Sequence, residues 1–256
     1  MNVFVCMNAI PTERLQALGH LEIIKRLAAA GADGIEIRKE LLTAEDSLEE
    51  LGALCRKLNL VAYYSAPEFL FASNHQLNER GFKRLIGEAQ ELGAVLLKVP
   101  LGSYHIKETN MRYVNELLSE NWANEGLAIT IENDQTPGGG NLQAITDFLG
   151  RSAALDTPIG MTFDTGNWLY TGEEPLLAAR ELAEYVSYVH LKQVKRVNEG
   201  WVTEPVAVPL LPEVNELLEK FNRNCPVAIE FPITLENAAT YISLMKIEQE
   251  VSHERA

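Results

Sequence analysis

Short apolar runs rich in β-branched residues alternate with amphipathic stretches along the whole chain. The apolar runs predict strands, because a parallel strand that is covered on both faces is apolar throughout. We expect eight of them, at residues 2–7, 33–38, 60–64, 94–99, 127–132, 159–163, 186–191 and 227–231. Apolar residues at helical spacing between these runs predict a helix after each strand.

The predicted helices cover residues 18–30, 44–58, 74–92, 107–124, 142–149, 174–185, 213–221 and 235–250. Gly31 and Gly93 follow two of them, as glycine often does at a helix end, and Asn141 is the expected N-cap of the fifth. Eight strand–helix units predict an α/β fold, a single-domain (β/α)₈ TIM barrel over residues 1–256. The alternative is an open doubly wound sheet, which would need a glycine-rich phosphate turn after the first strand; residues 7–11 contain no glycine.

Four of the predicted strands have, at or next to their last residue, a side chain that can bind a metal ion: Glu132, Asp164, His190 and Glu230. The carboxyl ends of all barrel strands lie on one face, so we expect these side chains to surround a single ion. Three carboxylates and one imidazole form a hard site made mostly of oxygen. Such a site favours Mn²⁺ first, then Mg²⁺ or Co²⁺, and is also compatible with Zn²⁺.

The same strand ends resemble the xylose isomerase-like TIM barrel family, which includes sugar and sugar phosphate isomerases and epimerases, inosose dehydratase and the endonuclease IV type of DNA repair enzyme. The resemblance covers essentially the whole chain, and its motifs lie at residues 34–37, 131–133, 163–166, 189–192 and 229–230. It implies that Glu132, Asp164, His190 and Glu230 bind one divalent cation. It also implies that Glu132 and Glu230 act as acid and base on opposite sides of the substrate carbon.

This ligand set suits proton transfer on a small polyhydroxy carbonyl compound. The cation acidifies the carbon-bound proton, one carboxylate removes it, and an enediolate forms. We therefore expect a metal-dependent isomerase or epimerase of a sugar or sugar phosphate. The alternatives are a metal-dependent dehydratase or lyase of a keto-polyol, similar to inosose dehydratase, a metal-free Schiff-base aldolase with Lys98 as nucleophile, and a non-catalytic sugar-binding barrel.

Further polar residues at strand ends are candidates for substrate binding: Glu36, Arg38, Lys98, Asn167 and Lys192. Glu36 would orient the substrate or a ligand, and Arg38 would contact a carboxylate or phosphate. The two lysines would hold substrate hydroxyl or acid groups. The alternative for all these charged residues is a set of salt bridges that line the barrel mouth.

One position departs from the family. Many members have Asp-x-x-His after the sixth strand, whereas this chain has Asp164-Thr165-Gly166-Asn167. An asparagine can donate a hydrogen bond to a substrate oxygen, but it is a poor metal ligand. A second metal at that place is therefore not expected. This disfavours the endonuclease branch, whose three-zinc cluster needs several histidines, because the chain has only five in all.

The charge balance also disfavours a DNA repair enzyme. The 22 basic and 36 acidic residues give a net charge of −14, and no basic stripe for nucleic acid is found in the sequence. No apolar run reaches the roughly 18 residues that span a membrane, and the chain starts without a signal-peptide pattern. Three scattered cysteines are expected to be reduced core residues of a cytoplasmic protein. Barrels of this type are often dimers or tetramers, and the sequence leaves the oligomeric state open.

Overall fold

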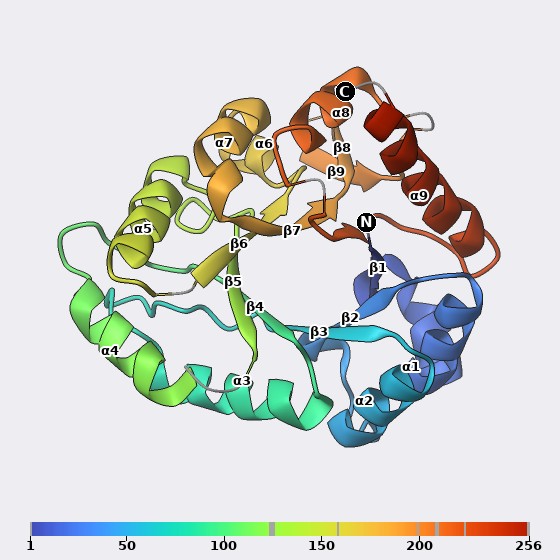
Figure 1. The fold of residues 1–256 in the computed structure, drawn as a ribbon, viewed down its shortest axis with the longest axis horizontal. Coiled ribbons are helices and arrows are strands. Elements are labelled where there is room, and N and C mark those ends of the chain that lie inside the picture. Colours follow the sequence, from blue (N-terminus) through green and yellow to red (C-terminus); the bar gives the residue numbers. More distant parts are fainter. Residues whose placement is uncertain are drawn as a thin grey trace.

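The computed structural model is a closed parallel barrel surrounded by helices (Figure 1). It describes residues 2–122, 126–157, 159–198, 200–207, 210–222 and 224–254. Around the barrel the strands follow the order β1-β10-β7-β6-β5-β4-β3-β2. Their bounds are β1 Val3–Cys6, β2 Gly34–Arg38, β3 Val61–Ser65, β4 Leu96–Pro100, β5 Ala128–Glu132, β6 Ile159–Asp164, β7 Val186–Leu191 and β10 Val227–Ile229. The single-domain (β/α)₈ barrel is confirmed.

Each predicted helix has a counterpart on the outside of the barrel. The bounds are α1 Thr12–Ala29, α2 Leu48–Lys57, α3 Glu79–Leu92, α4 Met111–Trp122, α5 Leu142–Ala154, α7 Pro175–Leu182, α8 Pro212–Leu218 and α9 Ala238–Glu254. Asn141 caps α5 as expected, because its side-chain oxygen accepts a hydrogen bond of 2.9 Å from the Ala144 amide. The short helix α6 Trp168–Thr171 was not predicted.

Several helix ends differ from the prediction. Helix α1 begins at Thr12, and its predicted start lies beside a kink at Gly19, whose φ of +73° breaks the helical pattern. Helix α3 begins only after Asn78, which caps it, rather than at residue 74. Helix α5 continues past residue 149 to Ala154. The predicted end of the fourth helix, at residue 124, lies outside the described residues.

The loop after β7 contains an unexpected antiparallel hairpin, β8 Gln193–Val197 and β9 Gly200–Glu204. Its Trp201 ring lies 6.2 Å from the ring of Tyr170 on α6. A methyl group at Gly166 would come within 3.0 Å of Val194, so the hairpin packs closely on the loop that follows β6. The segment from Gln193 onward therefore covers one side of the barrel mouth.

Aromatic side chains fill the barrel interior below the mouth. Phe4 and Tyr63 are stacked with ring centroids 4.2 Å apart, and Tyr188 contacts Tyr63 edge-on at 4.8 Å. The Tyr188 ring in turn contacts the His190 ring at 4.9 Å. The strand-end residues are thus supported from below by a packed apolar layer.

Cys6, Cys55 and Cys225 are all buried free thiols, as expected. In the part of the chain that the structure describes, no helix has the length and apolarity to cross a membrane.

Candidate metal centre

The barrel brings the four predicted metal ligands together. Glu132 and Asp164 are the last residues of β5 and β6, His190 lies one residue before the end of β7, and Glu230 directly follows β10. One donor atom from each of the four lies within 4.8 Å of the others. All four side chains are buried. The predicted donor set of three carboxylates and one imidazole is therefore assembled in a small volume.

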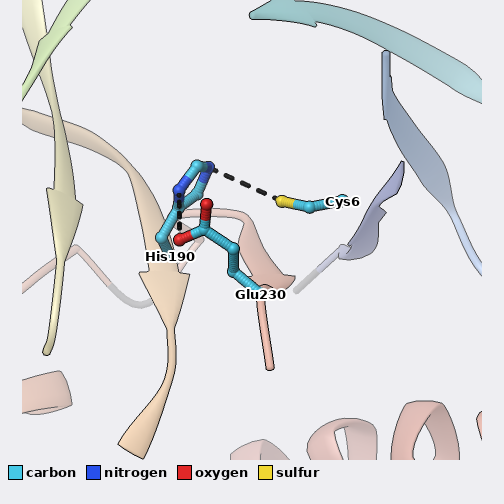
Figure 2. A group of neighbouring side chains, drawn as sticks. All are labelled: Cys6, His190 and Glu230. Carbon is cyan, nitrogen blue, oxygen red and sulfur yellow. Dashed lines mark hydrogen bonds and ion pairs between the residues drawn. The ribbon is translucent and has the colours of Figure 1, made fainter. Parts of the chain in front are cut away.

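The two ring nitrogens of His190 have different neighbours. Its Nε2 atom lies 2.7 Å from Glu36 Oε2. Its Nδ1 atom lies 2.8 Å from Glu132 Oε1 and 3.1 Å from Glu230 Oε2, yet it is buried and forms no hydrogen bond. Figure 2 shows the imidazole beside Glu230 and Cys6. A buried ring nitrogen that is surrounded by carboxylate oxygens but not hydrogen bonded to them fits a metal ligand.

Asp164 offers a second donor of this kind. Its Oδ1 atom accepts hydrogen bonds of 2.8 Å from the backbone amides of both Gly166 and Asn167, which fixes the carboxylate on the turn after β6. Its Oδ2 atom is buried and lies 2.7 Å from Lys192 Nζ without hydrogen-bond geometry. The residues present thus fit a hard divalent cation, with one oxygen of Asp164 held in place and the other free to coordinate.

Two buried lysines lie between the carboxylates. Lys98 Nζ pairs with Glu132 Oε2 and lies 3.7 Å from Glu36 Oε1. Lys192 Nζ, besides Asp164, lies 3.2 Å from Glu230 Oε2. Both predicted substrate-binding lysines therefore lie within the cluster, where they also neutralise the charge of its carboxylates.

Arg38 supplies a third cation. Its Nη1 atom donates to Glu230 Oε1 at 3.0 Å and to Glu36 Oε1 at 3.3 Å, and its Nε atom donates to Glu40 Oε1 at 2.8 Å. Asn8 Nδ2 donates to the same oxygen of Glu230 at 3.1 Å. Glu230 is thus held by several donors before any ligand binds.

The cations keep the two candidate catalytic carboxylates charged. Burial alone would raise the pKa of Glu132, but Lys98 and His190 hold it at about 2. Against the same effect of burial, Lys192 and His190 hold the pKa of Glu230 well below its usual range. Both groups are therefore ionised near neutral pH and are able to accept a proton.

The pKa of Asp164 is shifted in the opposite direction. Burial, together with the charges of Glu230 and Glu132, raises its pKa to about 7 although Lys192 opposes the shift. Of these three carboxylates Asp164 is therefore the least compensated.

Lys98 carries its proton at neutral pH, because Glu132 and Glu36 raise the pKa of its ammonium group against the effects of burial and of Arg38. A protonated amine is not a nucleophile, which disfavours the Schiff-base alternative.

Two predicted substrate-binding residues are engaged by the protein itself. Glu36 is fully buried, and both its oxygens contact protein groups. Asn167 Nδ2 donates to the carbonyl of Asn133 at 2.8 Å, and its Oδ1 accepts from Gln135 at 3.1 Å. A substrate contact at Asn167 would have to replace these bonds.

Sequence reasoning missed the contribution of the first strand. Cys6 ends β1, with its Sγ atom 3.7 Å from His190 Nε2, and Asn8 follows two residues later. The available signal was the position of Asn8, a polar residue just beyond a strand end, as in the four predicted ligands.

Comparison with known proteins gives the same fold. A family model described as xylose isomerase-like TIM barrel matches residues 24–244. None of the curated proteins matches the sequence. A solved structure of a xylose isomerase-like TIM barrel/4-hydroxyphenylpyruvate dioxygenase fusion protein has a TM-score of 0.74 at 18% identity. That match covers 100% of this chain and 43% of the fusion protein, so this chain spans less than half of that protein's length.

Two further solved structures match over nearly their full length. The IOLI protein with a binding zinc atom has a TM-score of 0.70 at 15% identity, with 97% of this chain and 98% of that chain covered. An L-ribulose 3-epimerase has a TM-score of 0.66 at 13% identity, with 99% and 96% covered. At such identities the likeness establishes the fold alone.

Proposed function

Because the chain belongs to the xylose isomerase-like TIM barrel family, we propose that it is a divalent-metal-dependent isomerase or epimerase of a sugar or sugar phosphate. The observation that carries the proposal is the convergence of donor atoms from Glu132, Asp164, His190 and Glu230 within 4.8 Å of one another. The zinc atom in the IOLI protein and the activity named for L-ribulose 3-epimerase support it.

These four residues would hold the cation, with Mn²⁺ as the first candidate because the donors are mostly oxygen. When bound, the cation would polarise the carbonyl group of the substrate and acidify the neighbouring C–H. Glu132 and Glu230 would move the proton. Whichever carboxylate faces the C–H accepts it, and that carboxylate or the other returns a proton to a different carbon or face.

The cations around the carboxylates would serve the same reaction. Arg38, Lys98 and Lys192 present positive charge to the cluster within hydrogen-bond or ion-pair distance of its carboxylates. We assign them to binding substrate oxygens and to stabilising the negative charge that develops on the enediolate. A sugar phosphate or acid group would also pair with them.

The first test is elemental analysis of the purified protein together with deuterium uptake from heavy water into a panel of ketoses. We expect one divalent ion per chain and solvent exchange at a carbon next to the carbonyl. His190→Ala should lose the ion, whereas His105→Ala, which changes a partly exposed histidine of a surface loop, should keep it. A wild-type protein that binds no divalent metal, even after reconstitution with Mn²⁺, would refute the proposal.

The alternative functions predict different outcomes with the same substrates. A dehydratase would release a product lighter by one water, because the enediolate would expel a β-hydroxyl instead of being reprotonated. A Schiff-base aldolase would be active in the presence of chelators, and borohydride with a carbonyl substrate would label Lys98. A sugar-binding barrel would bind metal and ketose without solvent exchange.

Replacing the catalytic carboxylates gives a sharper prediction. Glu132→Gln and Glu230→Gln should each lower kcat by about 10²–10⁴-fold, the usual contribution of a general acid or base. Glu88→Gln is the control, because Glu88 pairs with Lys39 and Tyr64 on the outer side of the barrel wall. Exchange rates in the glutamine variants that match those of Glu88→Gln would exclude both residues from catalysis.

A further inference from the structure

Glu36 contacts the ring nitrogen of His190 that does not face the other metal ligands. Glu36 Oε2 lies 2.7 Å from His190 Nε2, and both side chains have no exposed surface. The opposite ring nitrogen, Nδ1, faces Glu132 and Glu230. We propose that Glu36 is a positioning residue: it holds the proton of His190 on Nε2 and so presents the Nδ1 lone pair to the metal. The inference rests on the proposed function, because it assigns a ligand tautomer within that metal centre.

The tautomer follows from the geometry. A carboxylate can only accept a hydrogen bond, so the proton between Glu36 and His190 belongs to Nε2. A cation that binds at Nδ1 would displace any proton from that atom, and the proton that remains on Nε2 then leaves Nδ1 as the lone pair that binds the metal. The buried Nδ1 has carboxylate oxygens at 2.8 and 3.1 Å but no hydrogen bond. A cation bound between Nδ1 and these oxygens would satisfy all of them at once.

Glu36 is itself fixed from the other side. Its second oxygen, Oε1, accepts from Arg38 Nη1 at 3.3 Å and lies 3.7 Å from Lys98 Nζ. Strand β2 places it in register with Cys6 of β1 and Tyr63 of β3, inside the barrel wall. Cys6 Sγ also lies 3.7 Å from His190 Nε2. No atom of Glu36 reaches solvent, so the carboxylate acts on His190 and not on a substrate.

A carboxylate that accepts from a metal-bound histidine raises the basicity of the ligand and fixes the ring orientation. Loss of such a partner costs about 10–100-fold in metal affinity. Glu36→Gln is nearly isosteric and can still accept a hydrogen bond, but it removes the charge. The control is Glu40→Gln, because Glu40 contacts the same Arg38 at 2.8 Å and does not touch His190.

The experiment has two parts. First, titration of the metal-free proteins with Mn²⁺ alone should show a dissociation constant raised about 10–100-fold in Glu36→Gln and unchanged in Glu40→Gln. Deuterium exchange at saturating Mn²⁺ should then show a substrate KM close to that of the wild type. A Glu36→Gln protein with unchanged Mn²⁺ affinity and a raised KM would overturn the inference and return Glu36 to substrate binding.

Second, the wild type alone reports the tautomer. Nitrogen-15 spectra of the histidine-labelled, Zn²⁺-loaded protein should show His190 protonated on Nε2 and metal-bound through Nδ1. Protonation on Nδ1 would overturn the inference even if Glu36→Gln does not fold. Failure of the wild type to bind Mn²⁺ or Zn²⁺ would refute the proposed function itself. If the wild type binds either ion and Glu36→Gln binds Mn²⁺ with the same affinity, only the positioning role of Glu36 is refuted.

Discussion

Asp164 differs from the other carboxylates at the barrel mouth in its charge balance. Cationic neighbours hold the pKa values of Glu36, Glu132 and Glu230 below their usual range, although burial opposes them. The pKa of Asp164 is instead raised from 3.8 to about 7. An ionised Asp164 is therefore destabilising in the metal-free protein, and a bound cation would relieve that penalty. Sites that sacrifice stability for binding in this way are common.

This difference predicts a stabilising substitution. A raised folded-state pKa means that the wild type loses stability as the pH rises from about 4 to 7, because the folded protein then holds a proton that the unfolded chain releases. Asp164→Asn removes the titrating group, and its amide oxygen can still accept from Gly166 and Asn167. At pH 8 and without metal, we expect the variant to be more stable by about 1–4 kcal/mol, since each pKa unit corresponds to about 1.4 kcal/mol and Lys192 loses a partner.

Urea unfolding of metal-free wild type and Asp164→Asn at pH 8 and pH 4 measures this effect. The difference should shrink at pH 4, where the wild-type carboxyl is largely protonated. The variant should also fail to bind Mn²⁺. A variant that is less stable than the wild type at pH 8 would show that the Lys192 ion pair outweighs the burial of the charge.

At the scale of elements, close helix packing predicts opposite outcomes for two glycines. Gly52 in α2 faces α3 so closely that a Cβ atom would lie 1.8 Å from the carbonyl oxygen of Leu92. Gly87 in α3 has nothing within 4 Å of that position. Gly52→Ala should destabilise the protein by about 1–3 kcal/mol through overpacking. Gly87→Ala should stabilise it by about 0.5–1 kcal/mol through helix propensity.

Thermal unfolding of the two variants provides the measurement, and each variant is the other's control because the substitution is the same in both helices. Two variants that shift in the same direction would contradict the tight α2–α3 contact.

The sequence predicted the elements better than their ends. The eight barrel strands are apolar because both faces are covered, and that pattern is readable without a structure. The start of α3 was placed too early, because nothing before Asn78 distinguishes an irregular loop from a first helical turn. The β8–β9 hairpin was missed, although Asn198 and Gly200 lie between two short segments with β-branched and aromatic residues, which is a hairpin signal.

In the candidate site, too, some features could be predicted from the sequence and others could not. Glu132, Asp164, His190 and Glu230 could be found because each stands at a strand end. For Glu36 the sequence left open whether it orients the substrate or a ligand, and its partner could not be identified because His190 is 154 residues away in sequence. A strand-end carboxylate has the same local signal whether it binds substrate or orients a histidine, so only the folded barrel, in which Glu36 of β2 meets His190 of β7, separates the two roles.

At the scale of the whole molecule, metal binding should be coupled to global stability. An ion that binds only the folded state adds about 2.7 kcal/mol at a concentration 100 times its dissociation constant. For a protein of this size that corresponds to a rise in Tm of about 5–11 °C. The chain's net charge of −14 also favours the approach of cations.

Calorimetric scans with Mn²⁺ and with a chelator measure this stabilisation. His190→Ala should unfold at the same temperature in both buffers, whereas His105→Ala should retain the shift. A wild type that is insensitive to Mn²⁺ would contradict a metal centre formed by the folded barrel.

The closing seam of the barrel has a consequence for how the protein acquires its ion. Parallel pairing of β1 with β10 joins the two ends of the sheet, with Val3 opposite Val227. That seam brings Asn8 and the Arg38–Glu36 pair to Glu230. A partly folded intermediate without the seam could keep β10 paired with β7, and so Glu230 beside His190, but it would lack the contacts of Asn8 and Arg38 with Glu230. Full orientation of the Glu230 carboxylate would thus be a late event in folding, and tight ion binding would report a closed barrel.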